Sequence, residues 1–186
     1  MPVLVRRNER MIMPAALLDS PESCVNADVR AGKYLAFQLD REEFAIQVQN
    51  VREILGVLDI TPVPQTPTFV KGLINLRGKV IPVVDLRLRF AMDAAEYTHR
   101  TSIVVVQINT GQGNTILMGV IVDAVSEVLA VTAADISDAP SFGQDVAVPY
   151  VLGLAKMKGK VKILVDIAHV LTAGELERID MGAVNA

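Results

Sequence analysis

Two stretches of the chain repeat each other without a gap, and this internal repeat constrains the fold more than any other feature of the sequence. Residues 72–87 are GLINLRGKVIPVVDLR and residues 153–167 are GLAKMKGKVKILVDI, at a constant offset of 81 residues. The matched positions are Gly72 with Gly153, Gly78 with Gly159, Lys79 with Lys160, Val80 with Val161, Asp85 with Asp166 and Leu86 with Ile167. Such self-similarity indicates two copies of one structural unit.

A second pair of matching blocks precedes the first pair in each half. Residues 45–55 (AIQVQNVREIL) match residues 119–129 (GVIVDAVSEVL) at an offset of 74 residues. The difference of seven residues between the two offsets falls in the loop regions around 62–67 and 139–149, and loops are where insertions are tolerated. A period of this size is that of a small domain and not of a solenoid repeat.

The segments between turn-forming residues favour short β-strands. Apolar runs predict strands at 34–39, 43–48, 72–76, 79–84, 101–108, 115–122 and 161–165. Helical spacing of apolar residues predicts a short helical turn at 49–55 and one or two helical segments within 166–179. Each half holds about five strands, and so small a sheet has exposed edges unless it curls into a barrel. We therefore predict a mainly β fold of two pseudo-symmetric five-stranded β-barrels packed together, with short helices and a C-terminal helix.

The same pattern predicts how the chain is divided. Residues 1–31 have no sustained period and are expected to form a flexible N-terminal extension. We expect a first barrel at about 32–98 and a second at about 99–172, followed by the end of a C-terminal helix and a tail at 173–186.

Composition excludes several classes of protein. The formal net charge of −3 argues against a nucleic-acid binder, which usually has a basic face. Cys24 is the single cysteine, so no internal disulfide is possible and a reducing cytosol is the natural setting. Arg6, Arg7 and Arg10 precede an apolar stretch, but Pro14 interrupts it and no cleavage motif follows. No apolar run has the length of a membrane span, so we expect a cytoplasmic protein without direct membrane insertion.

The acidic pair Asp85 and Asp166 is the sharpest enzyme hypothesis that the sequence offers. One aspartate in each half is the arrangement of a hydrolase in which two carboxylates share a proton. The residues that follow are Leu86-Arg87 and Ile167-Ala168, whereas such enzymes have small residues there. An aspartate between a strand and a helix is a natural N-cap, and we favour structural caps over catalysis. The two histidines, His99 and His169, lack a motif with metal-ligand spacing.

Two glutamates and one arginine have both a structural and a functional interpretation. Glu53 and Glu127 lie at matching positions in otherwise apolar segments, either on a solvated face or as carboxylates that pair with a basic group. Arg77 is such a group at the tip of a predicted hairpin, where its counterpart in the second half is Lys158. From the residues alone, an interface and an ordinary polar surface remain equally open.

These motifs together resemble the CheW-type chemotaxis coupling (adaptor) proteins. The segments FAIQVQNVREIL, TPTFVKGLINLRGKVIPVVDLR, GVIVDAVSEVL and GLAKMKGKVKILVDI occur in the order typical of that family, and the resemblance covers about residues 33–171. It implies two five-stranded SH3-like barrels, no enzymatic activity and no cofactor. Members bridge the cytoplasmic hairpin tips of methyl-accepting chemoreceptors to the regulatory domain of a CheA-type histidine kinase. They assemble into arrays at the inner face of the membrane, and rings with other CheW-like proteins are a further option.

The resemblance also assigns roles to residues. It implies a receptor-binding surface formed by Asn75, Leu76, Arg77, Gly78, Val80, Met118 and Val128. It implies a kinase-binding surface formed by Val51, Glu53 and Ile54, with a second kinase contact at Ser137 to Phe142 that closes rings.

Three departures from the family pattern suggest a paralogue with altered partners. Ser137 stands where well-studied members have a basic residue, and Ser102 stands where an apolar residue is usual. The N-terminal extension is longer than in minimal members. A non-flagellar pathway, such as one that controls twitching or biofilm formation, is therefore an alternative to flagellar chemotaxis.

Overall fold

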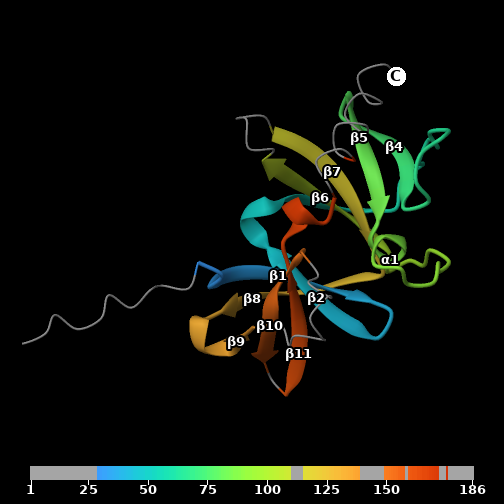
Figure 1. Cartoon of the computed structure of the whole chain (residues 1–186). Coiled ribbons are helices and arrows are strands. Elements are labelled where there is room, and N and C mark those ends of the chain that lie inside the picture. Colours follow the sequence, from blue (N-terminus) through green and yellow to red (C-terminus); the bar gives the residue numbers. More distant parts are fainter. Residues whose placement is uncertain (1–28, 110–114, 139–148, 158, 172–174, 176–186) are drawn as a thin grey trace, which may run out of the picture.

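The computed structural model of the protein describes residues 29–109, 115–138, 149–157, 159–171 and 175. The chain forms two β-sheets that pack against each other (Figure 1). The first sheet has the strand order β8-β1-β2-β11-β10-β9, and the second has the order β3-β6-β7-β5-β4. The prediction of a mainly β fold with two packed units is confirmed, although the sheets have six and five strands. The sixth strand, β9, is only two residues long.

The strands of the six-stranded sheet come from both ends of the described chain. They are β1 (Gly32–Leu39), β2 (Glu42–Gln47), β8 (Ala124–Val131), β9 (Ile136–Ser137), β10 (Val151–Met157) and β11 (Lys160–Val165). The five-stranded sheet is contiguous in sequence. Its strands are β3 (Val51–Gly56), β4 (Val70–Leu76), β5 (Lys79–Asp85), β6 (Ser102–Asn109) and β7 (Thr115–Val122).

The helical segments are short. They are the α-helix α1 (Leu86–Arg89) and the 3-10 helices η1 (Val48–Asn50), η2 (Ala133–Asp135) and η3 (Ile167–His169). The helical turn predicted at 49–55 is wrong beyond Asn50, because β3 begins at Val51 and pairs with β6. Burial alternates along β3, and this period of two is that of a strand with one face covered. Among the described residues, no helix is long and apolar enough to cross a membrane.

The predicted division of the chain at about residue 98 does not match the sheets. The hairpin β1–β2 belongs to the same sheet as β10 and β11, and β3 to β7 form the other sheet. Strand β5 pairs in parallel with β7, and β11 pairs in parallel with β2, so each sheet combines strands of both sequence repeats. The sequence repeat indicates which strands of the two halves are equivalent. It does not indicate whether a strand pairs with a strand of its own half or with one of the other half. The predicted segments 1–31 and 173–186 lie almost wholly outside the described residues.

Three apolar clusters form the core. The largest lies between the two sheets and contains Phe37, Phe44, Val106 and Met118. Each sheet also has a cluster of its own on its other face, because side chains alternate between the two faces of a strand. One of these surrounds Tyr34 and Leu164, and the other surrounds Ile81 and Ile103.

The repeated glycines Gly72 and Gly153 lie at equivalent irregularities of the two hairpins. The pairing register shifts between Val70 and Gly72 in β4, and between Val151 and Gly153 in β10. A Cβ atom on Gly72 would lie 2.1 Å from the carbonyl oxygen of Thr61, and one on Gly153 would lie 2.9 Å from that of Ser137. The repeat therefore preserves glycine where another chain segment crosses the hairpin closely.

Candidate functional site

The turn between β4 and β5 presents Arg77 on a rigid support. Arg77 and Gly78 both have positive φ angles, of 53° and 84°. The backbone N–H of Gly78 donates a hydrogen bond of 2.9 Å to Oδ1 of Asn75, which fixes the turn. The hairpin tip lies at the top of the molecule in Figure 1, and the tip of β10–β11 lies at the bottom. The side chain of Arg77 is therefore held out to solvent by a defined backbone.

Arg77 forms an ion pair with Glu53 of β3. Nη2 of Arg77 lies 2.9 Å from Oε2 of Glu53. Strands β3 and β4 are the two edges of the five-stranded sheet, so this contact joins the hairpin at one edge to the strand at the other. The predicted receptor-binding and kinase-binding residues consequently meet at this ion pair. Glu53 therefore does pair with a basic group, as one of the two interpretations of the sequence predicted, and that group belongs to the same chain.

Exposed apolar side chains occur at equivalent positions of the two repeats. They are Ile54 (45% exposed), Val80 (42%), Val128 (57%) and Val161 (52%). Val128 is the counterpart of Ile54, and Val161 is the counterpart of Val80. Exposed apolar residues repeated at the same places in two sheets are candidates for contacts with partners. Of the other predicted residues, Val51 and Leu76 are partly buried.

Met118 does not belong to such a surface. Its side chain is completely buried in the cluster between the sheets, so it cannot contact a receptor in this conformation. Its assignment to the receptor-binding surface is therefore corrected to a core position. The even-numbered residues of β7 that share its face, Val120 and Val122, are buried in the same cluster.

The predicted second kinase contact is only partly described. Ser137 lies in β9 at the edge of the six-stranded sheet, where it pairs with Leu154 and is half-buried. Phe142 lies outside the described residues.

Asp85 and Asp166 both stand at the N-terminus of a short helix. One carboxylate oxygen of Asp85 accepts hydrogen bonds from the backbone N–H groups of Arg87 and Leu88. Asp166 accepts from the backbone N–H of Ala168 and contacts the ring Nδ1 of His169 at 2.8 Å. Burial raises the pKa of Asp85, while the two backbone hydrogen bonds oppose this rise. Each carboxylate accepts hydrogen bonds from the first turn of the helix that follows it, which is the geometry of an N-cap.

Arg87 makes a contact that the sequence did not indicate. Its guanidinium, 14% exposed, binds both carboxylate oxygens of Asp123 at distances of 2.7 to 3.0 Å. Asp123 also accepts a hydrogen bond from the backbone N–H of Asp40 in the β1–β2 turn. Burial by itself would raise the pKa of Asp123, but the hydrogen bonds from Arg87 and Asp40 outweigh it and lower that pKa. This contact ties α1 to the connection between β7 and β8 and, through Asp123, to the β1–β2 turn of the other sheet.

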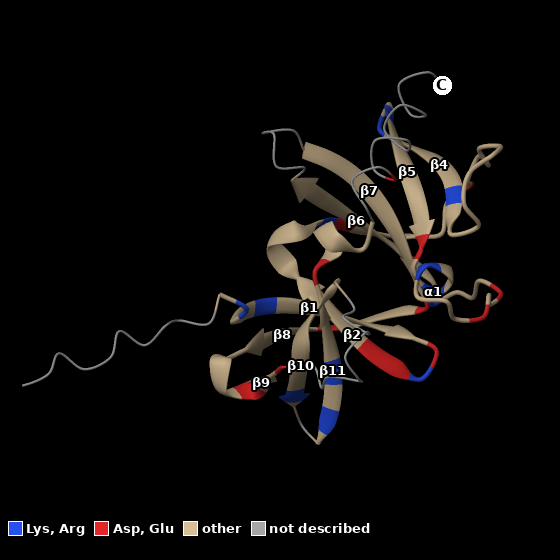
Figure 2. Ribbon diagram, viewed as in Figure 1, with Lys and Arg blue, Asp and Glu red and all other residues tan. Residues whose placement is uncertain are grey.

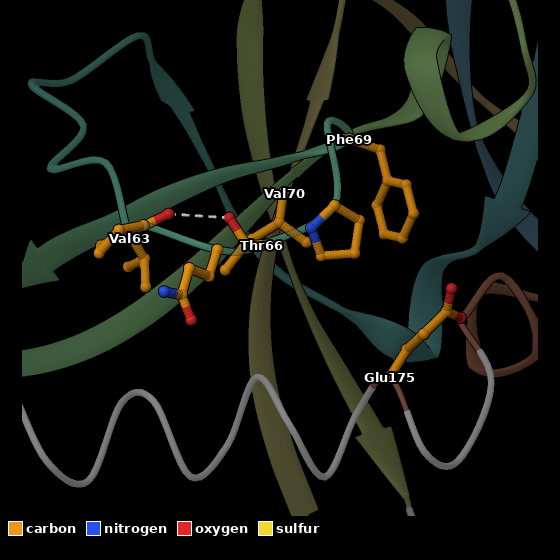
Figure 3. A pocket seen from close by; sticks show the side chains of 8 residues that line it. Val63, Thr66, Phe69, Val70 and Glu175 are labelled. Carbon is orange, nitrogen blue, oxygen red and sulfur yellow. Dashed lines mark hydrogen bonds between the residues drawn. The ribbon is translucent and has the colours of Figure 1, made fainter.

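A small pocket beside the proline-rich segment at 61–67 is mostly apolar. It has a volume of about 230 Å³, and Figure 3 shows Val63, Thr66, Phe69, Val70 and Glu175 around it. The hydroxyl of Thr66 donates to the carbonyl oxygen of Val63 at 2.9 Å. Glu175 is the one charged side chain among the described residues that line this pocket. No group of three or more histidine, cysteine or acidic side chains suited to a metal ion occurs within the described part of the chain.

Comparisons with known proteins agree with the resemblance seen in the sequence. A family model described as a CheW-like domain matches residues 33–175. "Chemotaxis protein CheW" from Klebsiella aerogenes is 39% identical over 148 residues, with 80% of this chain and 86% of that protein covered. Protein FrzA from Myxococcus xanthus is 29% identical over 141 residues, with coverages of 75% and 85%. The crystal structure of the scaffolding protein TtCheW from Thermoanaerobacter tengcongensis is 32% identical and superposes with a TM-score of 0.67, covering 78% of this chain and 90% of that one.

Proposed function

Because this chain belongs to the CheW-like domain family, we propose that it is a non-enzymatic scaffold that couples chemoreceptors to a CheA-type histidine kinase. The observation that carries the proposal is the rigid turn of β4–β5, with Arg77 exposed at its tip and Val80 beside it. Polar and apolar groups fixed on a rigid element suit recognition of a partner. The carboxylates of Asp85 and Asp166, by contrast, are engaged with the backbone of their own helices.

The proposed receptor-binding surface lies on the hairpin β4–β5. Asn75, Leu76, Arg77, Gly78 and Val80 belong to it, and Val128 on the other sheet is a further member. A receptor hairpin is a pair of helices, and an amphipathic helix binds through an apolar stripe that is aligned by polar contacts. Val80 and Val128 would cover the apolar stripe, and Arg77 would fix the register of the helix.

The proposed kinase-binding surface lies on β3. Val51, Glu53 and Ile54 are on an edge strand of the five-stranded sheet, where unpaired backbone groups are available to another chain. Ile54 is exposed and would bury its side chain against the regulatory domain of the kinase. Ser137 on β9, the edge strand of the other sheet, and Phe142 form the proposed second contact. Many such weak contacts within an array add through their effective concentration.

The proposal is tested with the purified chain, a receptor cytoplasmic fragment and the kinase regulatory domain from the same organism. We expect Arg77→Ala to weaken capture of the receptor fragment, and Ile54→Ala to weaken capture of the kinase domain. Each change should cost roughly 1 to 2 kcal/mol, typical of a residue near the centre of an interface. Lys33→Ala, an exposed position of β1, is the control and should change neither. Equal capture by all four proteins would contradict the assignment of both surfaces.

A further inference from the structure

The hairpin β10–β11 carries an unusual concentration of positive charge for an acidic protein. The sequence from 156 to 162 is KMKGKVK, with lysine at every second position. Lys156 and Lys160 are exposed, and Figure 2 shows basic residues gathered toward the lower ends of β10 and β11. The chain as a whole has a formal net charge of −3, so this hairpin is a local departure from its average.

One carboxylate compensates only part of this charge. Glu43 of β2 accepts a hydrogen bond from Nζ of the buried Lys162, and it also pairs with Nζ of Lys160 at 3.2 Å. A single negative charge therefore serves two ammonium groups. Arg41, in the neighbouring β1–β2 turn, adds a further positive charge near the hairpin, and Glu42 subtracts one. Among the described residues of this hairpin and turn, the basic side chains of Arg41, Lys156, Lys160 and Lys162 outnumber the carboxylates of Glu42 and Glu43.

Apolar surface lies directly beside these charges. Val161 is 52% exposed and pairs with Lys156 across the hairpin. A cavity of about 620 Å³ is lined by three apolar residues, Leu154, Val161 and Ile163, and by the polar residues Gln38, Arg41, Glu42, Glu43 and Lys160. The basic groups and the apolar side chains therefore form one surface, which we call the lysine hairpin surface: Arg41, Leu154, Lys156, Lys160, Val161 and Ile163.

We propose that the lysine hairpin surface binds an acidic protein segment in which carboxylates flank an apolar side chain. The carboxylates would contact Lys156, Lys160 and Arg41, while the apolar side chain would enter the cavity beside Val161. Charge complementarity to Lys156, Lys160 and Arg41 selects the sign of the partner. The apolar side chains of Leu154, Val161 and Ile163 within the cavity favour a polypeptide, whose apolar side chain can pack against them, over a polyphosphate, which has no such group. This surface is separate from the hairpin β4–β5, so the inference does not rest on the proposed function.

A peptide probe tests the inference directly. The probe is a fluorescent peptide in which pairs of glutamates flank single leucines, and binding to the full chain is followed by anisotropy. We expect binding that weakens as ionic strength rises, because exposed charges are screened by salt. Lys156→Glu should weaken binding by about tenfold, through loss of an attraction and gain of a repulsion. Val161→Ser should weaken it by a similar factor, about tenfold, through loss of apolar burial.

The equivalent hairpin supplies the matched control. Lys79 is the counterpart of Lys160 in the other repeat, so Lys79→Glu makes the same change of charge away from the lysine hairpin surface and should leave binding unchanged. Thermal unfolding checks that each variant is folded, and Lys156→Gln replaces Lys156→Glu if the latter is not. The inference is overturned if the wild-type chain does not bind the peptide. Equal weakening by Lys79→Glu, unchanged binding after loss of the leucines, or tighter binding to single-stranded RNA or phosphatidylglycerol vesicles would also overturn it.

Discussion

Apart from the short β9, the two sheets have the same arrangement of equivalent strands. They differ in the residues of the core cluster that each sheet has on its own face, which we call the interior of that sheet. The pairing of Val83 with Gly119 in one sheet corresponds, at the repeat offsets, to the pairing of Leu164 with Ala45 in the other. At the positions of Ile81 and Leu117 in the five-stranded sheet, the six-stranded sheet has Lys162 and Glu43. Ile81 and Leu117 belong to an apolar cluster, whereas Lys162 and Glu43 form an ion pair. Backbone geometry has thus been preserved in both repeats while the interior has diverged.

This comparison shows how a charge can occupy an interior position of a small sheet. Lys162 is only 4% exposed, and a buried ammonium group is tolerated when it is paired and hydrogen-bonded. Three of the residues that surround the interior of the six-stranded sheet are the small Ala36, Ala45 and Ala155. A buried ion pair contributes little net stability relative to apolar residues, because desolvation of both charges opposes their attraction.

The largest expected effect is that of breaking the ion pair from one side. Glu43→Leu leaves Lys162 buried without its carboxylate and should lower the free energy of unfolding by about 3 kcal/mol or more. The double variant Glu43→Leu/Lys162→Ile has the residues that the five-stranded sheet has at these positions, and it should restore the free energy of unfolding to the wild-type value or above it. Urea unfolding measures both. A double variant as unstable as Glu43→Leu would show that the two interiors are not interchangeable.

The second largest effect on stability is expected at Gly72 and Gly153, where the pairing register shifts in the hairpins β4–β5 and β10–β11. Gly72→Ala should destabilise the protein by about 2 to 3 kcal/mol, because its φ is 141° and the new Cβ would meet the backbone oxygen of Thr61. Gly153→Ala should cost less, about 1 to 2 kcal/mol, since its new Cβ would lie 2.9 Å from the carbonyl oxygen of Ser137, farther than the 2.1 Å at Gly72, while its φ of 156° is also unfavourable for alanine. Thermal unfolding of the two variants, compared side by side, ranks them. The opposite ranking would show that the segment at Thr61 adjusts more easily than β9.

The two helix caps, Asp85 and Asp166, are expected to differ less in the stability that is lost when each is replaced. Asp85→Ala removes the acceptor for two backbone N–H groups and should cost about 1 kcal/mol or slightly more. Asp166→Ala removes the acceptor for one backbone N–H at the start of η3, and about 0.5 to 1 kcal/mol is expected. Asp85→Asn, which keeps an acceptor oxygen, serves as the control and should recover most of the loss. Chemical denaturation provides the measurement, and a loss twice as large for Asp166→Ala would reverse the comparison.

The smallest expected effect is on the pH dependence of stability. Hydrogen bonds from Lys162 and Lys160 lower the pKa of Glu43 in the folded state, from an ordinary value of 4.5. A lowered folded-state pKa of an acid contributes stability that is present above about 4.5 and is lost as the pH falls through the folded value. The double variant Glu43→Leu/Lys162→Ile should therefore lose less stability in acid than the wild type. Asp85 and Asp123 titrate in both proteins, so parallel pH profiles would contradict the assignment to Glu43.

The sequence predicted the repeated elements well because their period and turn residues are local properties. The hairpins around Gly78 and Gly159, and the candidate caps Asp85 and Asp166, follow from this. It could not predict that strands are exchanged between the repeats, since pairing depends on contacts distant in the sequence. Lys162 and Met118 show a second limit. Whether each side chain is buried depends on which face of its strand it lies on. The charge of Lys162 suggests an exposed position, and the receptor-binding role assigned to Met118 suggests the same, but both residues lie on the covered face of their strand.

The candidate site shows the same division between local and distant information. The turn that exposes Arg77 follows from Asn75 and Gly78, which lie next to it in the chain. Arg77 was proposed as a basic group that Glu53 or Glu127 could pair with, and the structure pairs it with Glu53, across the sheet from the turn. The contact between Arg87 and Asp123 joins residues of both repeats and has no periodic pattern that would have revealed it.

The exchange of strands between the repeats has a consequence for the order in which the chain can fold. Strands β3 to β7 are contiguous, so the five-stranded sheet is complete once residue 122 has left the ribosome. The hairpin β1–β2 is synthesised first, yet its sheet neighbours β8 and β11 are synthesised after the other sheet is finished. Contacts between segments so distant in sequence form slowly, because the long intervening loop must be closed first. The earliest strands of the chain are therefore among the last to reach their final pairing, and until then their apolar faces stay uncovered, which favours aggregation.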